Sequence, residues 1–167
     1  MTLHLVRRSL LVASAALPLI GRAETPLVPS ALSGGNLAGR WVYRSFINNP
    51  DVAEDFGKLR LAAAVLEIPA YSGGEFRGTM TTANWQLRLT GSVQGERVTM
   101  RAFQASPNTA GWIYDYLGWA VPQWKDATDQ AETLVGSTLR VVDHDNLRGG
   151  ISKGGLTYSF VLVKQPQ

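Results

Sequence analysis

Alternation of apolar and polar residues in short runs is the feature that most constrains the fold of this 167-residue chain. In Glu75–Met80, Trp85–Gly91 and Glu96–Phe103, apolar residues or glycine alternate with polar or charged residues. Successive side chains of a β-strand point to opposite faces of a sheet. Each run therefore predicts a strand with one buried face and one solvated face.

Five further runs have strand-like composition and are separated by segments rich in Gly, Asn, Asp and Pro: Leu37–Phe46, Leu61–Ile68, Trp112–Val121, Leu134–Val142 and Leu156–Val163. The composition of Leu61–Ile68 also fits a helix, but its length and the proline directly after it favour a buried strand. One helical turn is expected in Asp51–Lys58, and Pro122–Glu132 is expected to be a long irregular loop.

The order of these elements predicts an all-β domain spanning residues 37–164. Eight strands follow one another without intervening helices, which indicates an antiparallel meander and not a parallel sheet. An eight-stranded meander with apolar inner faces usually closes into a β-barrel, because closure removes the exposed edges. An open two-sheet sandwich is the alternative.

Residues 1–23 have the pattern of an export signal peptide. Arg7 and Arg8 form a positive start, Ser9–Ile20 is an apolar run, and small residues precede a cleavage site near Ala23. The apolar run is too short for a membrane-spanning helix, which needs about 20 residues, so no membrane span is expected. We expect a periplasmic or secreted protein, exported by the Sec route or, given the paired arginines, the twin-arginine route. Residues 24–36 read as a flexible leader.

Charge and composition exclude several classes of function. Removal of the three signal-peptide arginines leaves 13 basic and 13 acidic residues, with no basic run, so no nucleic-acid partner is expected. The absence of cysteine removes thiol catalysis and thiolate metal sites. His144 is the one histidine beyond the signal. We therefore expect no metal site, no cofactor and no catalytic residue set.

A resemblance to a known group rests on short motifs. Gly39-Arg40-Trp41 resembles the G-x-W signature of the calycins, the lipocalin and avidin group of eight-stranded barrels. The segments 74–79 (GEFRGT), 89–91 (LTG) and 133–136 (TLVG) are similar to avidin strands. The resemblance implies that Trp41 lies at the closed end of a barrel and that a ligand enters at the other end. No residues match the polar set that avidins use for biotin, so biotin is not implied.

The aromatic stretch from Gly111 to Trp124 is the main candidate site. It holds three of the five tryptophans and two of the five tyrosines. We expect a small apolar or amphipathic ligand, held in the barrel by burial and stacking, with the Gly118–Trp124 loop over the mouth. The candidate lining and rim residues are Trp41, Tyr43, Trp85, Trp112, Tyr114, Tyr116, Trp119 and Trp124. The alternative is that Trp119 and Trp124 fold back and plug the barrel.

Three polar features of the sequence are further candidate sites. Asp115 alternates with Tyr114 and Tyr116, so it faces outward if the tyrosines face inward. The Asp143-His144-Asp145 triplet has catalytic residue types, but its composition favours a turn between two strands. Four arginines on the polar phase of successive strands are expected on the solvated exterior: Arg77, Arg88, Arg97 and Arg101.

Two other classes of function remain open at this stage. A filled barrel could serve as an envelope interaction module or inhibitor, with the Gly118–Trp124 loop contacting a protein partner. A cofactor-free isomerase or cyclase would use Asp115 or a tyrosine as proton donor. The sequence leaves the oligomeric state open.

Overall fold

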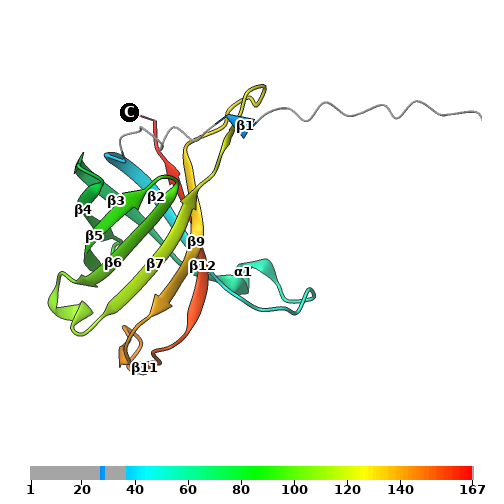
Figure 1. Cartoon of the computed structure of the whole chain (residues 1–167). Helices are drawn as coiled ribbons and strands as arrows, with labels where there is room; N and C mark the ends of the chain where they lie inside the picture. The colour runs from blue at the N-terminus through cyan, green and yellow to red at the C-terminus, as the bar shows by residue number, and fades with distance from the viewer. Residues whose placement is uncertain (1–26, 29–36, 167) are drawn as a thin grey trace, which may run out of the picture.

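The protein is a closed, eight-stranded antiparallel β-barrel, as the sequence predicts (Figure 1). The structure, a computed structural model, describes residues 27–28 and 37–166. The elements are β1 (Leu27–Val28), β2 (Gly39–Ile47), α1 (Phe56–Leu59), β3 (Arg60–Ser72), β4 (Glu75–Thr81), β5 (Gln86–Gln94), β6 (Arg97–Gln104), a 3₁₀ turn (Pro107–Thr109), β7 (Ile113–Ala120), β8 (Gln123–Trp124), β9 (Thr133–Arg140), β10 (His144–Asp145), β11 (Ile151–Ser152) and β12 (Thr157–Lys164).

Pairing of the last strand with the first closes the barrel. The strand order is β12-β2-β3-β4-β5-β6-β7-β9, and β12 pairs with both β2 and β9. Val161 at the middle of β12 lies opposite Arg44 on one side and Val135 on the other. Every barrel strand therefore has two neighbours, and none offers an open edge for pairing with another chain.

Burial follows the alternation seen in the sequence. In β4, Phe76 and Met80 are buried while Arg77 is exposed, and β5 and β6 repeat this pattern. The inward residues of all eight strands form one hydrophobic cluster. The open-sandwich alternative is thus wrong, because the inner faces belong to one closed sheet.

Strand β3 is longer than the sequence suggested. It continues through Pro69 to Ser72, with a register shift between Glu67 and Ala70 where it pairs with β4. Proline has no N–H to donate, and an irregularity in the ladder removes the need for one. Gly78 on β4 faces this irregularity, where a Cβ would lie 2.5 Å from the Glu67 carbonyl oxygen.

The end of the barrel where β2 begins is filled. Trp41 is fully buried, and its Nε1 donates to the Leu37 carbonyl at 3.0 Å. The Lys164 ammonium lies 5.4 Å from the Trp41 ring centroid and pairs with Glu132 at 2.6 Å. We call this the closed end, and it is where the sequence resemblance places Trp41.

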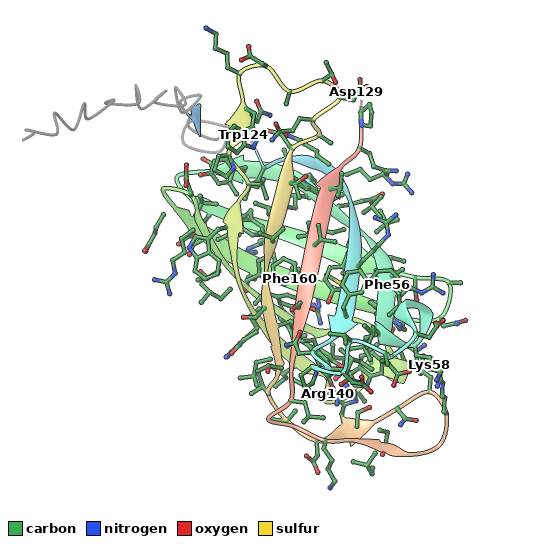
Figure 2. The ribbon with its side chains drawn as sticks, turned by 90° about the vertical axis from the view of Figure 1, so that its right-hand side faces the viewer. Phe56, Lys58, Trp124, Asp129, Arg140 and Phe160 are labelled. Carbon is green, nitrogen blue, oxygen red and sulfur yellow. The ribbon has the colours of Figure 1, made fainter. Side chains whose placement is uncertain are left out.

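The opposite end carries the loops that surround a cavity. It includes the segment that leads into α1 and the β10–β11 hairpin, which is inserted between β9 and β12. Figure 2 shows Arg140 and Lys58 at this end, Trp124 and Asp129 at the closed end, and Phe160 between them. We call it the open end.

The segment predicted as a flexible leader includes one paired stretch. Leu27–Val28 forms β1 and pairs antiparallel with β8, which places two residues of an aperiodic segment beside the closed-end loop. The predicted signal peptide lies outside the described residues. Within the described ranges, no helix has the length and apolar character needed to cross a bilayer.

Two glycines allow the barrel wall to pack tightly at mid-height. Gly118 on β7 lies directly opposite Gly136 on β9. A Cβ on Gly136 would lie 2.1 Å from the Leu117 carbonyl oxygen, and a Cβ on Gly118 would lie 2.8 Å from Cζ of Phe160. Gly118 thus leaves the space into which the Phe160 ring packs, and Gly136 lets the backbones of β7 and β9 approach closely.

We expect Gly136→Ala to destabilise the barrel by about 1–3 kcal/mol, because the added methyl meets backbone that cannot move without disturbing the ladder. Urea unfolding would measure the change. Ser137→Ala, at the exposed next position, is the matched control and should change stability by less than about 0.5 kcal/mol. Equal unfolding midpoints for Gly136→Ala and the wild type would contradict this close approach.

Candidate ligand-binding cavity

A cavity of about 630 Å³ occupies the open half of the barrel. This volume lies within the range of about 300–1,000 Å³ typical of small-molecule sites. One wall, formed by β7, β9, β12 and β2, carries polar and aromatic side chains: Tyr114, Tyr116, Thr138, Arg140, Tyr158, Tyr43 and Ser45. The facing wall, from β3, β5 and the loop before β5, includes Leu61, Ala62, Leu87 and Trp85.

The structure brings together five of the eight predicted site residues. The cavity is lined by Tyr43, Trp85, Trp112, Tyr114 and Tyr116. Trp41 points into the same barrel interior but is sealed in the closed end.

Trp119 and Trp124 lie at the other end of the molecule. Strand β7 runs from the open end to the closed end, so the loop that follows it emerges away from the cavity mouth. The two side chains are 47% and 52% exposed. They therefore neither cover the cavity nor plug the barrel.

Two aromatic rings, Tyr43 and Tyr116, line the floor of the cavity and pack on a third ring, Phe160. Tyr43 stacks on Phe160 with ring centroids 6.2 Å apart, and Tyr116 meets both rings edge-on at 6.1 and 5.5 Å. Burial raises the pKa of Tyr43 to about 12 and raises that of Tyr116 well above its usual value of 10. Both hydroxyls are thus neutral near pH 7 and can donate hydrogen bonds.

A directed hydrogen-bond network joins the barrel wall to the β10–β11 hairpin. His144 Nδ1 lies 2.8 Å from the Asp145 carbonyl oxygen, which can only accept, so Nδ1 carries the proton. In neutral His144, Nε2 then accepts the hydrogen bond from the Tyr114 hydroxyl at 2.8 Å. The Tyr114 oxygen in turn accepts from Arg140 Nε at 3.5 Å.

His144 is held in this network by its surroundings. It stacks on Trp112 at 4.6 Å, and Trp112 Nε1 donates to the same Asp145 carbonyl at 2.9 Å. Desolvation by burial lowers the pKa of His144, and the positive charge of Arg140 lowers it further. Burial likewise raises the pKa of Tyr114. The pair is therefore neutral near pH 7.

The turn interpretation of the Asp143-His144-Asp145 triplet needs correction. His144–Asp145 forms the short strand β10, and the His144 side chain is only 6% exposed. Asp143 is outside, where it binds the Lys153 ammonium at 2.7 Å and accepts from the Gly154 amide at 2.8 Å. The local sequence predicts a turn because Asp, Asn and Gly surround His144. It could not predict the burial of His144, because that burial arises only when the β10–β11 hairpin folds back over the end of the barrel.

The sequence-based prediction of the site left out several polar residues that line the cavity, although the alternation pattern places them on the inward faces of their strands. Thr138 and Arg140 are on the same phase of β9 as buried Leu134, and Ser45 is in phase with Trp41 and Tyr43. Polar residues at inward positions of otherwise apolar strands are a recognisable sign of a site.

Asp115 lies on the outer surface, as the alternation predicts when the tyrosines face inward. It forms a bidentate ion pair with Arg101, with distances of 2.6 and 2.7 Å. The four predicted exterior arginines are all exposed. Asp115 is consequently not placed to exchange a proton with a molecule in the cavity.

Two further hollows are shallow and lie on the outside of the barrel, over β2 to β6. Their volumes are about 960 and 620 Å³, and outward side chains such as Arg77, Arg88 and Thr90 line them. Neither contains a buried polar side chain directed at a ligand. The interior cavity is thus the candidate site.

Comparisons with protein-family models, with curated proteins and with solved structures give no match to this chain. Within residues 27–28 and 37–166, no group of three or more His, Cys, Asp or Glu side chains is arranged to hold a metal ion.

Acid should weaken the fold through His144. Its pKa in the folded state lies below the unfolded value of about 6.5, so between these two values the unfolded chain binds more protons. The contribution of His144 to the free energy of unfolding is therefore fully present above about pH 6.5 and is lost as the pH falls toward the folded-state pKa. The total loss is about 1.4 kcal/mol for each unit by which the folded-state pKa lies below the unfolded-state pKa. Thermal unfolding between pH 5 and 8 would measure this.

His144→Gln supplies the control for that experiment, because glutamine keeps a polar group but does not titrate. We expect the melting temperature of this variant to change less across pH 5–7 than that of the wild type. Asp143, whose pKa Lys153 lowers, acts in a separate window below about pH 4. An unchanged pH profile in His144→Gln would contradict the role given to His144.

Proposed function

We propose that this protein is an exported, calycin-like barrel that binds a small apolar or amphipathic molecule in the open-end cavity. The observation that carries the proposal is the cavity itself: it is closed below by an aromatic floor and bounded by one apolar wall and one polar wall. A ligand with an apolar body and a polar group fits both walls.

Burial against the apolar wall supplies affinity in this proposal. Trp85 and Trp112 pack with ring centroids 6.1 Å apart at the mouth, and Ala62 and Leu87 line the wall below. Removing apolar surface from water stabilises a complex by about 25 cal/mol per Å² before the costs of association. The neutral tyrosine hydroxyls can then orient the polar group of the ligand.

Export supports the same assignment. The signal pattern in residues 1–23 and the lack of cysteine fit a periplasmic or secreted protein that needs no disulfide, since closure of the sheet holds the fold. The short calycin motifs are consistent with a barrel of this shape, and the sealed position of Trp41 fits the same group.

N-phenyl-1-naphthylamine, an uncharged fluorescent probe, tests the binding function. We expect saturable binding to the mature protein, and at least a tenfold loss of affinity in Ala62→Trp, because the indole would fill the cavity. Trp119→Ala should bind the probe as the wild type does, since Trp119 lies near the closed end of β7, is exposed and does not line the cavity.

The outcome for Trp119→Ala separates two positions of the site. If this variant loses affinity while Ala62→Trp keeps it, the ligand binds on the outer surface near the closed end, where Trp119 of β7 is exposed, and the cavity proposal is wrong. Circular dichroism and melting temperature of both variants would establish that each is folded.

A contact with a protein partner is the second candidate. Trp119 is exposed and pairs across the sheet with Val135, which is 41% exposed, and Trp124 lies nearby in the chain on the same end. Exposed aromatic residues commonly anchor protein interfaces. A photo-crosslinking residue at position 119 would give one discrete adduct in the producing cell if this proposal holds, whereas the same residue at position 88 would give none.

A further inference from the structure

We propose that the ligand carries an oxyanion, such as a carboxylate or sulfonate, which binds the guanidinium of Arg140 while its apolar body lies against the facing wall. This inference rests on the proposed function and names the chemical class of the ligand.

Arg140 is a buried cation without an acidic partner. Its side chain is 7% exposed, and none of the ion pairs among the described residues includes it. Its Nη1 donates to the Lys153 carbonyl at 2.9 Å, and its Nε makes the long contact with Tyr114. A buried charge is costly unless it is paired. An anionic ligand would supply the missing charge.

Aromatic rings hold the guanidinium in place. Its central carbon lies 5.2 Å from the Tyr158 ring centroid and 5.9 Å from that of Tyr114. No hydrogen bond from Nη2 to another described residue is present. Because arginine presents its donors in a fixed planar fork, a guanidinium fixed in this way is suited to an oxyanion.

A second buried polar group lies on the same face. Thr138 is 2% exposed and lines the cavity. Its hydroxyl interacts with that of Tyr116 and lowers the Tyr116 pKa, but among the described residues its Oγ1 makes no hydrogen bond of standard geometry. Thr138 and Arg140 are two residues apart on β9, about 7 Å along the strand. An oxyanion has several acceptor sites and can accept from the Thr138 hydroxyl and the Arg140 guanidinium together.

The charges around the cavity favour an anion. Among the described residues that line it there is no Asp or Glu, whereas Lys58, Arg60 and Arg148 are cationic. Glu54 partly neutralises Lys58, at 3.1 Å, but no described ion pair includes Arg60 or Arg148. A cavity lined by one sign of charge attracts ligands of the opposite sign.

The test compares two probes with the same aromatic body. 8-Anilino-1-naphthalenesulfonate carries a sulfonate, and N-phenyl-1-naphthylamine lacks it. We expect the mature wild-type protein to bind the sulfonate about 10- to 100-fold more tightly, as hydrogen bonds to charged groups generally contribute. In Arg140→Met the ratio of the two affinities should fall to about one, and saturable binding of the uncharged probe by this variant shows that the cavity is still formed.

Each outcome decides between the two proposals. Equal binding of both probes by the wild type would overturn the anion proposal and leave the binding function standing, whereas binding of neither would overturn both. Persistence of the preference in Arg140→Met would overturn the assignment to Arg140.

Two milder variants decide the matter if Arg140→Met does not fold. Thr138→Val removes one hydroxyl at nearly constant volume, and Arg140→Lys keeps the charge but removes the fork. We expect both to weaken binding of the sulfonate by a factor of about 3 or more and to leave the uncharged probe unaffected. If neither variant changes the ratio of the two affinities, the anion proposal is wrong.

Discussion

Pairing of β12 with both β2 and β9 is the interaction on which the rest of the structure depends. It joins the two ends of the described domain and converts an open meander into a cylinder with an inside. Once the sheet is closed, the inward side chains of all strands must share one interior, and their sizes decide which part is filled. The same closure leaves the strands without edges, so the fold needs no disulfide to protect them.

The interior is divided unequally along the barrel axis. Trp41, Leu37 and the apolar residues around them fill the closed end, and the rings of Tyr43, Tyr116 and Phe160 form the boundary of this filled region. Gly118 on β7 gives Phe160 its space. Above this boundary the inward residues include polar ones such as Ser45, Thr138 and Arg140, which line the cavity.

Polar groups in the cavity come from segments that are far apart in the chain. Tyr114, Arg140 and His144 belong to two barrel strands and a hairpin, and one chain of hydrogen bonds connects them. Their mutual contacts explain why the hairpin lies against the barrel and why His144 is neutral. They also leave the Arg140 charge without an acidic partner among the described residues, which is the observation behind the proposed anionic ligand.

The sequence by itself determined the strands, their faces and the closed all-β architecture, because alternation with period two is a local property of the backbone. It correctly placed Asp115 outside once the tyrosines faced inward, and it identified five cavity-lining aromatics. Only the tertiary structure decided which end of the barrel each loop occupies. The tertiary structure places Trp119 and Trp124 away from the cavity, extends β3 past Pro69, and brings His144 beside Tyr114 and Arg140. Such contacts depend on strand direction, register and closure, which no single segment specifies.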